Sequence, residues 1–413
     1  MSEQNLRNVD QHIDNLEQEA IDLMKAIIPI KALGPLNDGD GEHDKADFLK
    51  KYLQKNGLTQ IEEYPSEDDQ ARDGYRPNLI LKIPGQDTSR TVWFLTHMDV
   101  VPEGDRSKWD TEPFEAVVKE GRIYGRGTED NNQSMVSAMM AAKALTDLDI
   151  TPHYNVGIAL VADEETGSTY GLQYLVDHHA DLFNEKDIII VPDAGEPDST
   201  MIEVAEKSII WVKFNVQGKQ VHASTPDKGI NAFRAGARLA VAVDELHEIY
   251  DARDEVFDVP YSTFEPTKKE ANVPNVNTIP GEDIFYLDCR ILPQYSIEDV
   301  MQNIRRMCDT IENDFNVKVE ISTEQEEQAA PATPHDAPVV KALQKAIKEV
   351  YQIDAKAMGI GGGTVAAIFR RAGYPAAVWS TIDDLAHQPN EYCIIKNLIN
   401  DAKVFAHVAM NAL

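Results

Sequence analysis

The chain has 413 residues, 42% of them hydrophobic, which is more than one domain usually holds, so two domains with buried cores are expected. Asp and Glu (70) outnumber Lys and Arg (39), and the formal net charge of −31 argues against a nucleic-acid partner, because phosphate binding needs clustered basic residues. The three cysteines, Cys289, Cys308 and Cys393, are too far apart in sequence to indicate a disulfide framework or a thiolate metal site.

The beginning of the chain is polar and acidic and lacks the apolar stretch of a signal peptide. No later apolar run is long enough to cross a bilayer. The sequence therefore predicts a cytoplasmic protein that does not insert into a membrane.

Helical and extended patterns alternate along the first half of the chain. Apolar residues at helical spacing predict helices over residues 8–30, 46–56, 133–145 and 168–178. Short apolar runs between turn residues predict strands over residues 78–83, 92–95, 156–162 and 188–191. This alternation is typical of an α/β domain, a mostly parallel sheet with helices on both faces.

The pattern changes after residue 206. Predicted strands (209–216, one within 261–280, 285–291, 317–321) and helices (231–250, 296–313) follow in the order β-α-β-β-α-β, which is typical of a ferredoxin-like α+β domain. Residues 324–337 are polar and contain prolines, so they are predicted to link back to the first domain, whose pattern resumes over 338–413. We therefore predict one domain over 1–206 and 322–413, with an inserted domain over 207–321.

His97 and Asp99 follow the apolar strand 92–95 and stand two positions apart. In an extended chain both side chains point the same way. The carboxylate can then hold the His ring from behind, or both groups can bind one metal.

Further acidic and His residues come just after predicted strands or before a helix: Asp130, Glu164, Glu165, Asp193 and His387. Each has a structural alternative, such as a helix N-cap for Asp130 or a solvated acidic turn for the two glutamates. Together they lie at the carboxyl ends of strands, where open sheets bind ligands. Nitrogen and oxygen ligands without cysteine suit zinc, with cobalt or manganese as alternatives. Because two His and at least three carboxylates are too many for one tetrahedral ion, they suit a pair of divalent ions.

The order and spelling of these segments resemble the family of co-catalytic zinc hydrolases that contains acetylornithine deacetylase, succinyl-diaminopimelate desuccinylase, aminoacylases, carnosine-type dipeptidases and glutamate carboxypeptidase. The segments are FLTHMDVVPEGD, GRGTEDNN, ADEETGS, VPDAG and TIDDLAHQPNEY. The resemblance covers nearly the whole chain. It implies a zinc-peptidase-like catalytic domain, an inserted dimerisation or lid domain over 207–321, and hence a homodimer.

The resemblance also implies a ligand set. His97 and Asp193 would bind one metal, Glu165 and His387 the other, and Asp130 would bridge the two. In that family the peptide bond after the bridging aspartate, here Asp130-Asn131, is typically cis.

The implied chemistry is amide hydrolysis by a metal-bridged hydroxide. Asp99 would orient His97, and Glu164 would act as the general base that takes a proton from water and returns it to the leaving nitrogen. His222 in VHASTPDKGINAF would help to hold the oxyanion, reaching the site of the other subunit. The alternative for His222 is a hydrogen-bonded turn residue.

Substrate contacts are implied at three places. Asn277 and Arg290 would hold the carboxylate of the substrate, and an intradomain ion pair is the alternative for Arg290. Gly362, Gly363 and Thr364, at the start of a predicted helix, would offer backbone amides to an anion. No Lys follows them, as a nucleotide-binding loop would need. Val365 stands where many relatives carry Asp, and Asp193 stands where several carry Glu.

We therefore predict a metal-dependent hydrolase that cleaves the amide bond of a small N-acyl amino acid, of the succinyl-diaminopimelate or acetylornithine kind. A dipeptidase, aminopeptidase or carboxypeptidase with the same two-metal site is the first alternative, because short peptides offer the same bond. A non-catalytic binding protein of the same fold is the second alternative, although no site residue is missing.

Overall fold

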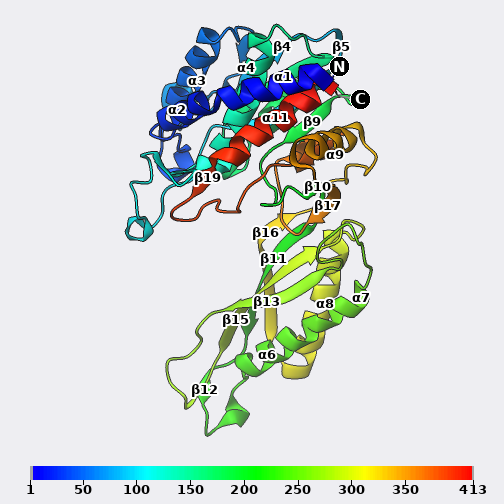
Figure 1. Cartoon of the computed structure of the whole chain (residues 1–413). Helices are drawn as coiled ribbons and strands as arrows, with labels where there is room; N and C mark the ends of the chain where they lie inside the picture. The colour runs from blue at the N-terminus through cyan, green and yellow to red at the C-terminus, as the bar shows by residue number, and fades with distance from the viewer. Residues whose placement is uncertain (1–2, 412–413) are drawn as a thin grey trace. The chain divides into compact units, whose positions relative to one another are not determined.

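The computed structural model describes residues 3–411 and divides into two compact units (Figure 1). Unit 1 takes in the chain up to Val204, Ala332–Ala357, and the chain from Thr364 onward, and unit 2 comprises Ala205–Pro331 and Met358–Gly363. The sequence predicted an inserted domain over 207–321. Unit 2 contains this range and extends it to 205–331, and it also includes the separate segment 358–363.

Unit 1 is built on an eight-stranded sheet with the order β1-β4-β8-β5-β9-β18-β10-β17. Its strands are β1 (Ile61–Glu63), β4 (Leu79–Ile83), β5 (Asp87–His97), β8 (Tyr154–Val161), β9 (Ile188–Val191), β10 (Met201–Glu206), β17 (Lys356–Ile360) and β18 (Ala376–Val378). The central strands β8, β5, β9 and β18 run parallel, while β4 and β10 flank them in antiparallel pairs. The chain passes between the two units within β10 and again within β17.

The described part of unit 1 also contains eight α-helices. They are α1 (Glu3–Asn15), α2 (Glu17–Ile27), α3 (His43–Lys55), α4 (Ser134–Asp147), α5 (Leu172–His178), α9 (Pro338–Tyr351), α10 (Ala366–Arg371) and α11 (Ile395–Asn411). Figure 1 shows α1 and α11 side by side, and α4 packs against both. The helices α5 and α10 pack together over a separate buried cluster on the sheet.

The central strand β5 has buried apolar side chains on both faces of the sheet. Trp93 and Leu95 belong to the buried cluster of α5 and α10, whereas Phe94 points to the other face and packs against Phe405 of α11, with ring centroids 4.8 Å apart. Gly157 lies opposite Trp93 in β8, and a Cβ there would come within 2.3 Å of the indole, so the residue must be glycine. The predicted α/β class, a mostly parallel sheet with helices on both faces, is confirmed.

Some predicted elements of unit 1 differ from the observed ones. The predicted helix over 8–30 is two helices that meet at Leu16, whose amide is shared between the carbonyls of His12 and Ile13. The predicted loop 102–127 contains β6 (Val117–Lys119) and β7 (Arg122–Tyr124), which form a three-stranded sheet with β19 (Tyr392–Ile394). The hairpin of β2 (Ser66–Glu67) and β3 (Tyr75–Arg76) and the strands β10 and β17 were also not predicted. Such short strands carry too little periodicity to be recognised without their partners.

Unit 2 has a four-stranded antiparallel sheet in the order β13-β15-β11-β16. The strands are β11 (Ser208–Gln217), β13 (Thr263–Lys269), β15 (Glu282–Ile291) and β16 (Lys318–Glu327), with helices α6 (Ala232–Ala242), α7 (Leu246–Ile249) and α8 (Ile297–Phe315), and the small ladder of β12 (Val221–His222) and β14 (Thr278–Ile279). The chain order β11-α6-β13-β15-α8-β16 is the predicted ferredoxin-like order. Strand β16 extends into the predicted linker 324–337, since it ends at Glu327.

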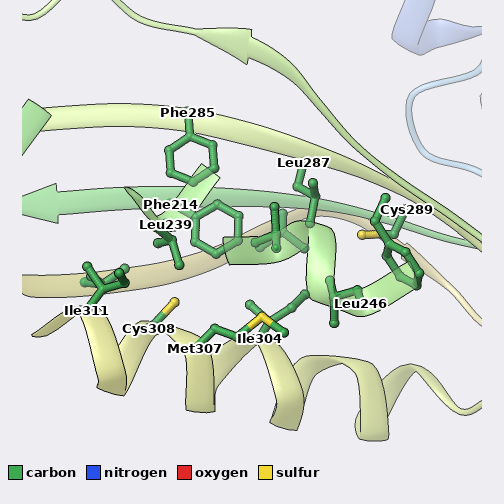
Figure 2. Close-up of a cluster of buried hydrophobic side chains, with 14 of the residues drawn as sticks. Phe214, Leu239, Leu246, Phe285, Leu287, Cys289, Ile304, Met307, Cys308 and Ile311 are labelled. Atoms are coloured by element: carbon green, nitrogen blue, oxygen red, sulfur yellow. The ribbon is translucent and has the colours of Figure 1, made fainter. Parts of the chain in front are cut away.

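The core of unit 2 comes from alternation along its strands. Phe214 of β11 and Phe285 of β15 are register partners whose rings stack at 4.6 Å, and Figure 2 shows them above the apolar side of α8. That side of α8 presents Ile304, Met307 and Ile311 at helical spacing. Among the described residues of the chain, none of the helices combines the length and apolar content needed to cross a bilayer.

Candidate metal centre

The residues predicted to hold metal gather at one edge of the unit 1 sheet. His97 is the last residue of β5, Glu164 and Glu165 follow β8, and Asp193 follows β9. Because β8, β5 and β9 are adjacent and parallel, their carboxyl ends meet at this edge.

Asp130 lies between the two predicted His ligands. Its Oδ1 is 2.9 Å from Nε2 of His97, and its Oδ2 is 3.3 Å from Nε2 of His387. The residue lies within the irregular segment Thr128–Gln133 ahead of α4, where the backbone of Asp130 and Asn131 is not helical. The Asp130-Asn131 peptide bond is cis, as the resemblance implied. One carboxylate thus faces both imidazoles, with one oxygen for each.

The remaining acidic side chains complete two groups. Oε2 of Glu165 is 2.9 Å from Nε2 of His387, and Oδ1 of Asp193 is 3.3 Å from Nε2 of His97. The amide of Asn131 donates to Oδ1 of Asp193 at 2.6 Å and fixes its orientation. The carboxylate of Glu164 approaches His97 only to 4.0 Å.

Asp99 connects His97 to the turn that carries the two glutamates. Its Oδ1 accepts from the backbone N–H of Glu164 at 3.1 Å, and its Oδ2 accepts from that of Glu165 at 3.0 Å. The Nδ1 of His97 is 3.1 Å from the carbonyl of Asp99 and 3.4 Å from its carboxylate. Nδ1 therefore carries the proton of the neutral ring, and Nε2 turns its lone pair toward Asp130 and Asp193.

The charges at this edge favour a cation. Burial would lower the pKa of His97, but Asp193, Asp130 and Asp99 outweigh it and hold this pKa well above its usual value. Hydrogen bonds to Asp130 and Glu165 raise the pKa of His387 to about 10. Burial raises the pKa of Glu164 well above its usual value, and the charge of Asp193 adds to the effect. Carboxylates crowded around imidazole nitrogens thus bind positive charge strongly, whether as protons or as a metal.

The donor set fits a divalent metal. The ligand atoms of His97, Asp130 and Glu165 all lie within 4.8 Å of one another, and the same holds for His97, Glu164 and Asp193. Oε1 of Glu165 is buried without a hydrogen-bond partner, and a cation would satisfy such an acceptor. Neutral imidazole and carboxylate ligands are those that zinc, cobalt and manganese take in proteins.

Sequence reasoning missed the charged residues that support the site from behind. Lys45 is 1% exposed and donates to the carbonyl of Met98 at 2.7 Å, between His97 and Asp99. Arg76 is equally buried, pairs with Glu42, and lies 3.4 Å from the carboxylate of Asp163, which directly precedes Glu164. No local pattern marks these residues, because their partners lie far away in the sequence.

The predicted substrate residues lie mostly in unit 2. His222 and Thr278 are register partners of β12 and β14, and the backbone N–H of Ser224 donates to Nδ1 of His222 at 3.1 Å, so the neutral ring carries its proton on Nε2. Arg290 makes a bidentate pair with Asp288 at 2.7 and 3.0 Å and also donates to the carbonyl of Gly361. This is the intradomain ion pair that the sequence offered as the alternative to a substrate contact.

The other predicted contacts lie in loops, outside the helices and strands. Asn277 accepts from the side chain of Asn275, Gly362 and Gly363 end the segment 358–363 of unit 2, and Thr364 returns the chain to unit 1. Helix α10 begins at Ala366, whose amide donates to the hydroxyl of Thr364 at 3.3 Å.

A family comparison agrees with the geometry of the site. Peptidase family M20/M25/M40 matches residues 93–411, a range that includes all the site residues. The chain belongs to this family. The resemblance found in the sequence is thereby confirmed, and the chain is an M20 metallohydrolase.

Relatives of this M20 metallohydrolase extend over almost its full length. An uncharacterized metallohydrolase of Methanocaldococcus jannaschii is 42% identical over 409 residues, covering 95% of this chain and 99% of its own. A succinyl-diaminopimelate desuccinylase of Sulfurovum sp. is 26% identical over 388 residues, covering 93% and 96%. The crystal structure of human carnosine dipeptidase 1 has the same fold, with a TM-score of 0.71, 19% identity and 98% of each chain covered.

Proposed function

We propose that this M20 metallohydrolase is a di-metal amidohydrolase, cleaving the amide bond of a small N-acyl amino acid with an acidic acyl or amino-acid part. The observation that carries the proposal is Asp130, whose two oxygens face His97 and His387 at 2.9 and 3.3 Å. A carboxylate shared in this way between two imidazoles suits two ions held side by side.

In this proposal His97 and Asp193 would hold one ion, Glu165 and His387 would hold the other, and Asp130 would serve both. Zinc is the proposed metal, with cobalt or manganese as replacements. The ions would supply Lewis acidity, which makes water a better nucleophile near neutral pH and polarises the amide carbonyl.

Glu164 is the proposed general base. Its backbone is held by Asp99, and its carboxylate makes no hydrogen bond to another described residue, so it is available to water. Glu164 accepts a proton as water attacks the amide carbon, and it donates that proton to the departing nitrogen. Asp99 orients the imidazole of His97 during the reaction.

We propose further that the chain forms a homodimer through unit 2 and that His222 serves the partner's site, as an Nε2–H donor to the oxyanion. The exposed side of α6 supports a dimer, since Phe233 and Val241 are 47% and 63% exposed there. Mixing Glu164→Gln and His222→Ala chains tests both points, because a mixed dimer that works in trans has one intact site. Activity should recover well above that of either variant, and no recovery would contradict the trans arrangement.

The substrate class rests on fewer observations. The desuccinylase relative is 26% identical, and Arg290 offers a guanidinium suited to a carboxylate, although it now pairs with Asp288. Initial rates on N-succinyl and N-acetyl amino acids, compared with free-amino dipeptides of the same residues, test the proposal. We expect kcat/KM to be higher for the N-acyl compounds, with Asn277 and the Gly362–Thr364 amides contributing to KM. A clear preference for dipeptides would contradict the substrate class and leave the metal centre as proposed.

A further inference from the structure

Glu391 lies behind the loop that carries Asp130. Its side chain is fully buried, and each of its two oxygens accepts hydrogen bonds from that loop. Oε2 accepts from the guanidinium of Arg126 at 2.7 Å and from the backbone N–H of Gly127 at 2.8 Å. Oε1 accepts from the backbone N–H groups of Glu129 and Asp130 at 2.9 and 3.2 Å. A residue four positions after His387 thus fixes the backbone of Asp130.

Glu129 makes the reverse connection. It directly precedes Asp130, yet its carboxylate, 3% exposed, turns toward the loop that carries His387. Its Oε1 accepts from the backbone N–H of Leu385 at 2.7 Å, and its Oε2 accepts from that of Asp383 at 3.2 Å. Arg126 adds a third link, because it donates to the carbonyl of His387 at 3.3 Å.

We propose that Glu129 and Glu391 are positioning residues. They hold His387 and Asp130 in the relative position that the ion at His387 and Glu165 needs. Each loop lends a buried carboxylate to the backbone amides of the other, and we call this pair the carboxylate clasp. His387 needs such support, because its side chain is 58% exposed and its backbone has φ of +63°, a conformation that non-glycine residues rarely adopt. This role of the clasp rests on the proposed function, because it concerns the metal ions that the proposed function assigns to the site.

The clasp should affect the ion position at His387 more than the position at His97 and Asp193. Glu129 bonds to the His387 loop, whereas His97 is fixed by β5 and Asp193 by Asn131. Groups that orient metal ligands typically change metal affinity by about 10- to 100-fold when mutated. If Glu129 served only the folding of the chain, its substitution would lower stability without weakening the binding of one ion more than the other.

The variant Glu129→Gln tests this difference. The amide has one acceptor oxygen, so its NH2 group must face one of the two N–H donors that the carboxylate now satisfies. Titration of the metal-free protein with Co²⁺, followed by calorimetry and by the visible spectrum of the bound ion, should show two equivalents in the wild type. In Glu129→Gln one equivalent should keep its Kd, and the other should weaken by about 10- to 100-fold.

Asp187→Asn is the matched control. Asp187 is also a buried carboxylate that accepts backbone N–H groups, from Thr91 and Asn184 at 2.8 and 3.0 Å. It directly precedes β9, whereas Asp193 follows the other end of that strand. The Asp187→Asn variant should lose stability and keep both Kd values. If Glu129→Gln does not fold, Glu129→Asp, which keeps the charge but is too short to reach both amides, should show the same selective weakening.

Each outcome decides between the two proposals. Two unchanged Kd values in the Glu129 variant, or equal weakening of one site by Asp187→Asn, would overturn the clasp and leave the proposed function intact. Failure of the wild-type protein to bind any metal would overturn the proposed function and the clasp together.

Discussion

Glu164→Gln is expected to lower turnover by about 10²- to 10⁴-fold while the protein retains its metals. The substitution keeps the size of the side chain and removes the group that accepts the proton of water. No hydrogen bond to another described residue holds the Glu164 carboxylate, and its backbone N–H is held by Asp99, so the exchange leaves the turn in position. Initial rates and metal content on the same preparation give both quantities.

The control for this variant is a glutamate away from the site. Glu112 is 60% exposed and pairs with Arg106, so Glu112→Gln should leave turnover and metal content unchanged. Near-normal turnover in Glu164→Gln would show that another group is the base. Loss of metal in the same variant would make Glu164 a ligand, which its place in the group with His97 and Asp193 also allows.

Asp130→Asn is expected to abolish turnover and to lose metal as well. The two oxygens of Asp130 face different imidazoles, and an amide keeps only one of them, turning its NH2 group toward the other ring. Metal content after dialysis should fall below that of the wild type, in contrast to Glu164→Gln. Wild-type metal content in Asp130→Asn would contradict the bridging role of this residue.

Local patterns were enough to predict the parallel strands of unit 1 and the candidate ligands that follow them. Apolar runs such as Val92–Leu95 marked the parallel strands, and parallel strands end at one edge, so His97 and Asp193 could be grouped before any coordinates were known. The same reasoning predicted the strand order of unit 2 along the chain, because alternation and helical spacing are local signals there.

The supporting residues could not be predicted, since they act across long sequence separations. Glu391 lies more than 260 positions along the chain from the backbone N–H groups that donate hydrogen bonds to it. Glu42 lies 34 positions from its partner Arg76. Each looks like an ordinary surface residue in the sequence, yet each is fully buried. Short strands such as β10 and β17 were missed for a related reason, because their partners in the sheet, not their own periodicity, make them strands.

The number of metal ions per chain tests the two-metal site most directly. It is measured by elemental analysis of protein purified without chelator, together with N-acyl hydrolysis before and after chelation. We expect about two equivalents, loss of activity on chelation, and recovery with zinc, cobalt or manganese, because the two His and three carboxylates of the site suit two ions. No bound metal, and no activity after metal is added back, would contradict the two-metal site and favour a binding protein with this fold.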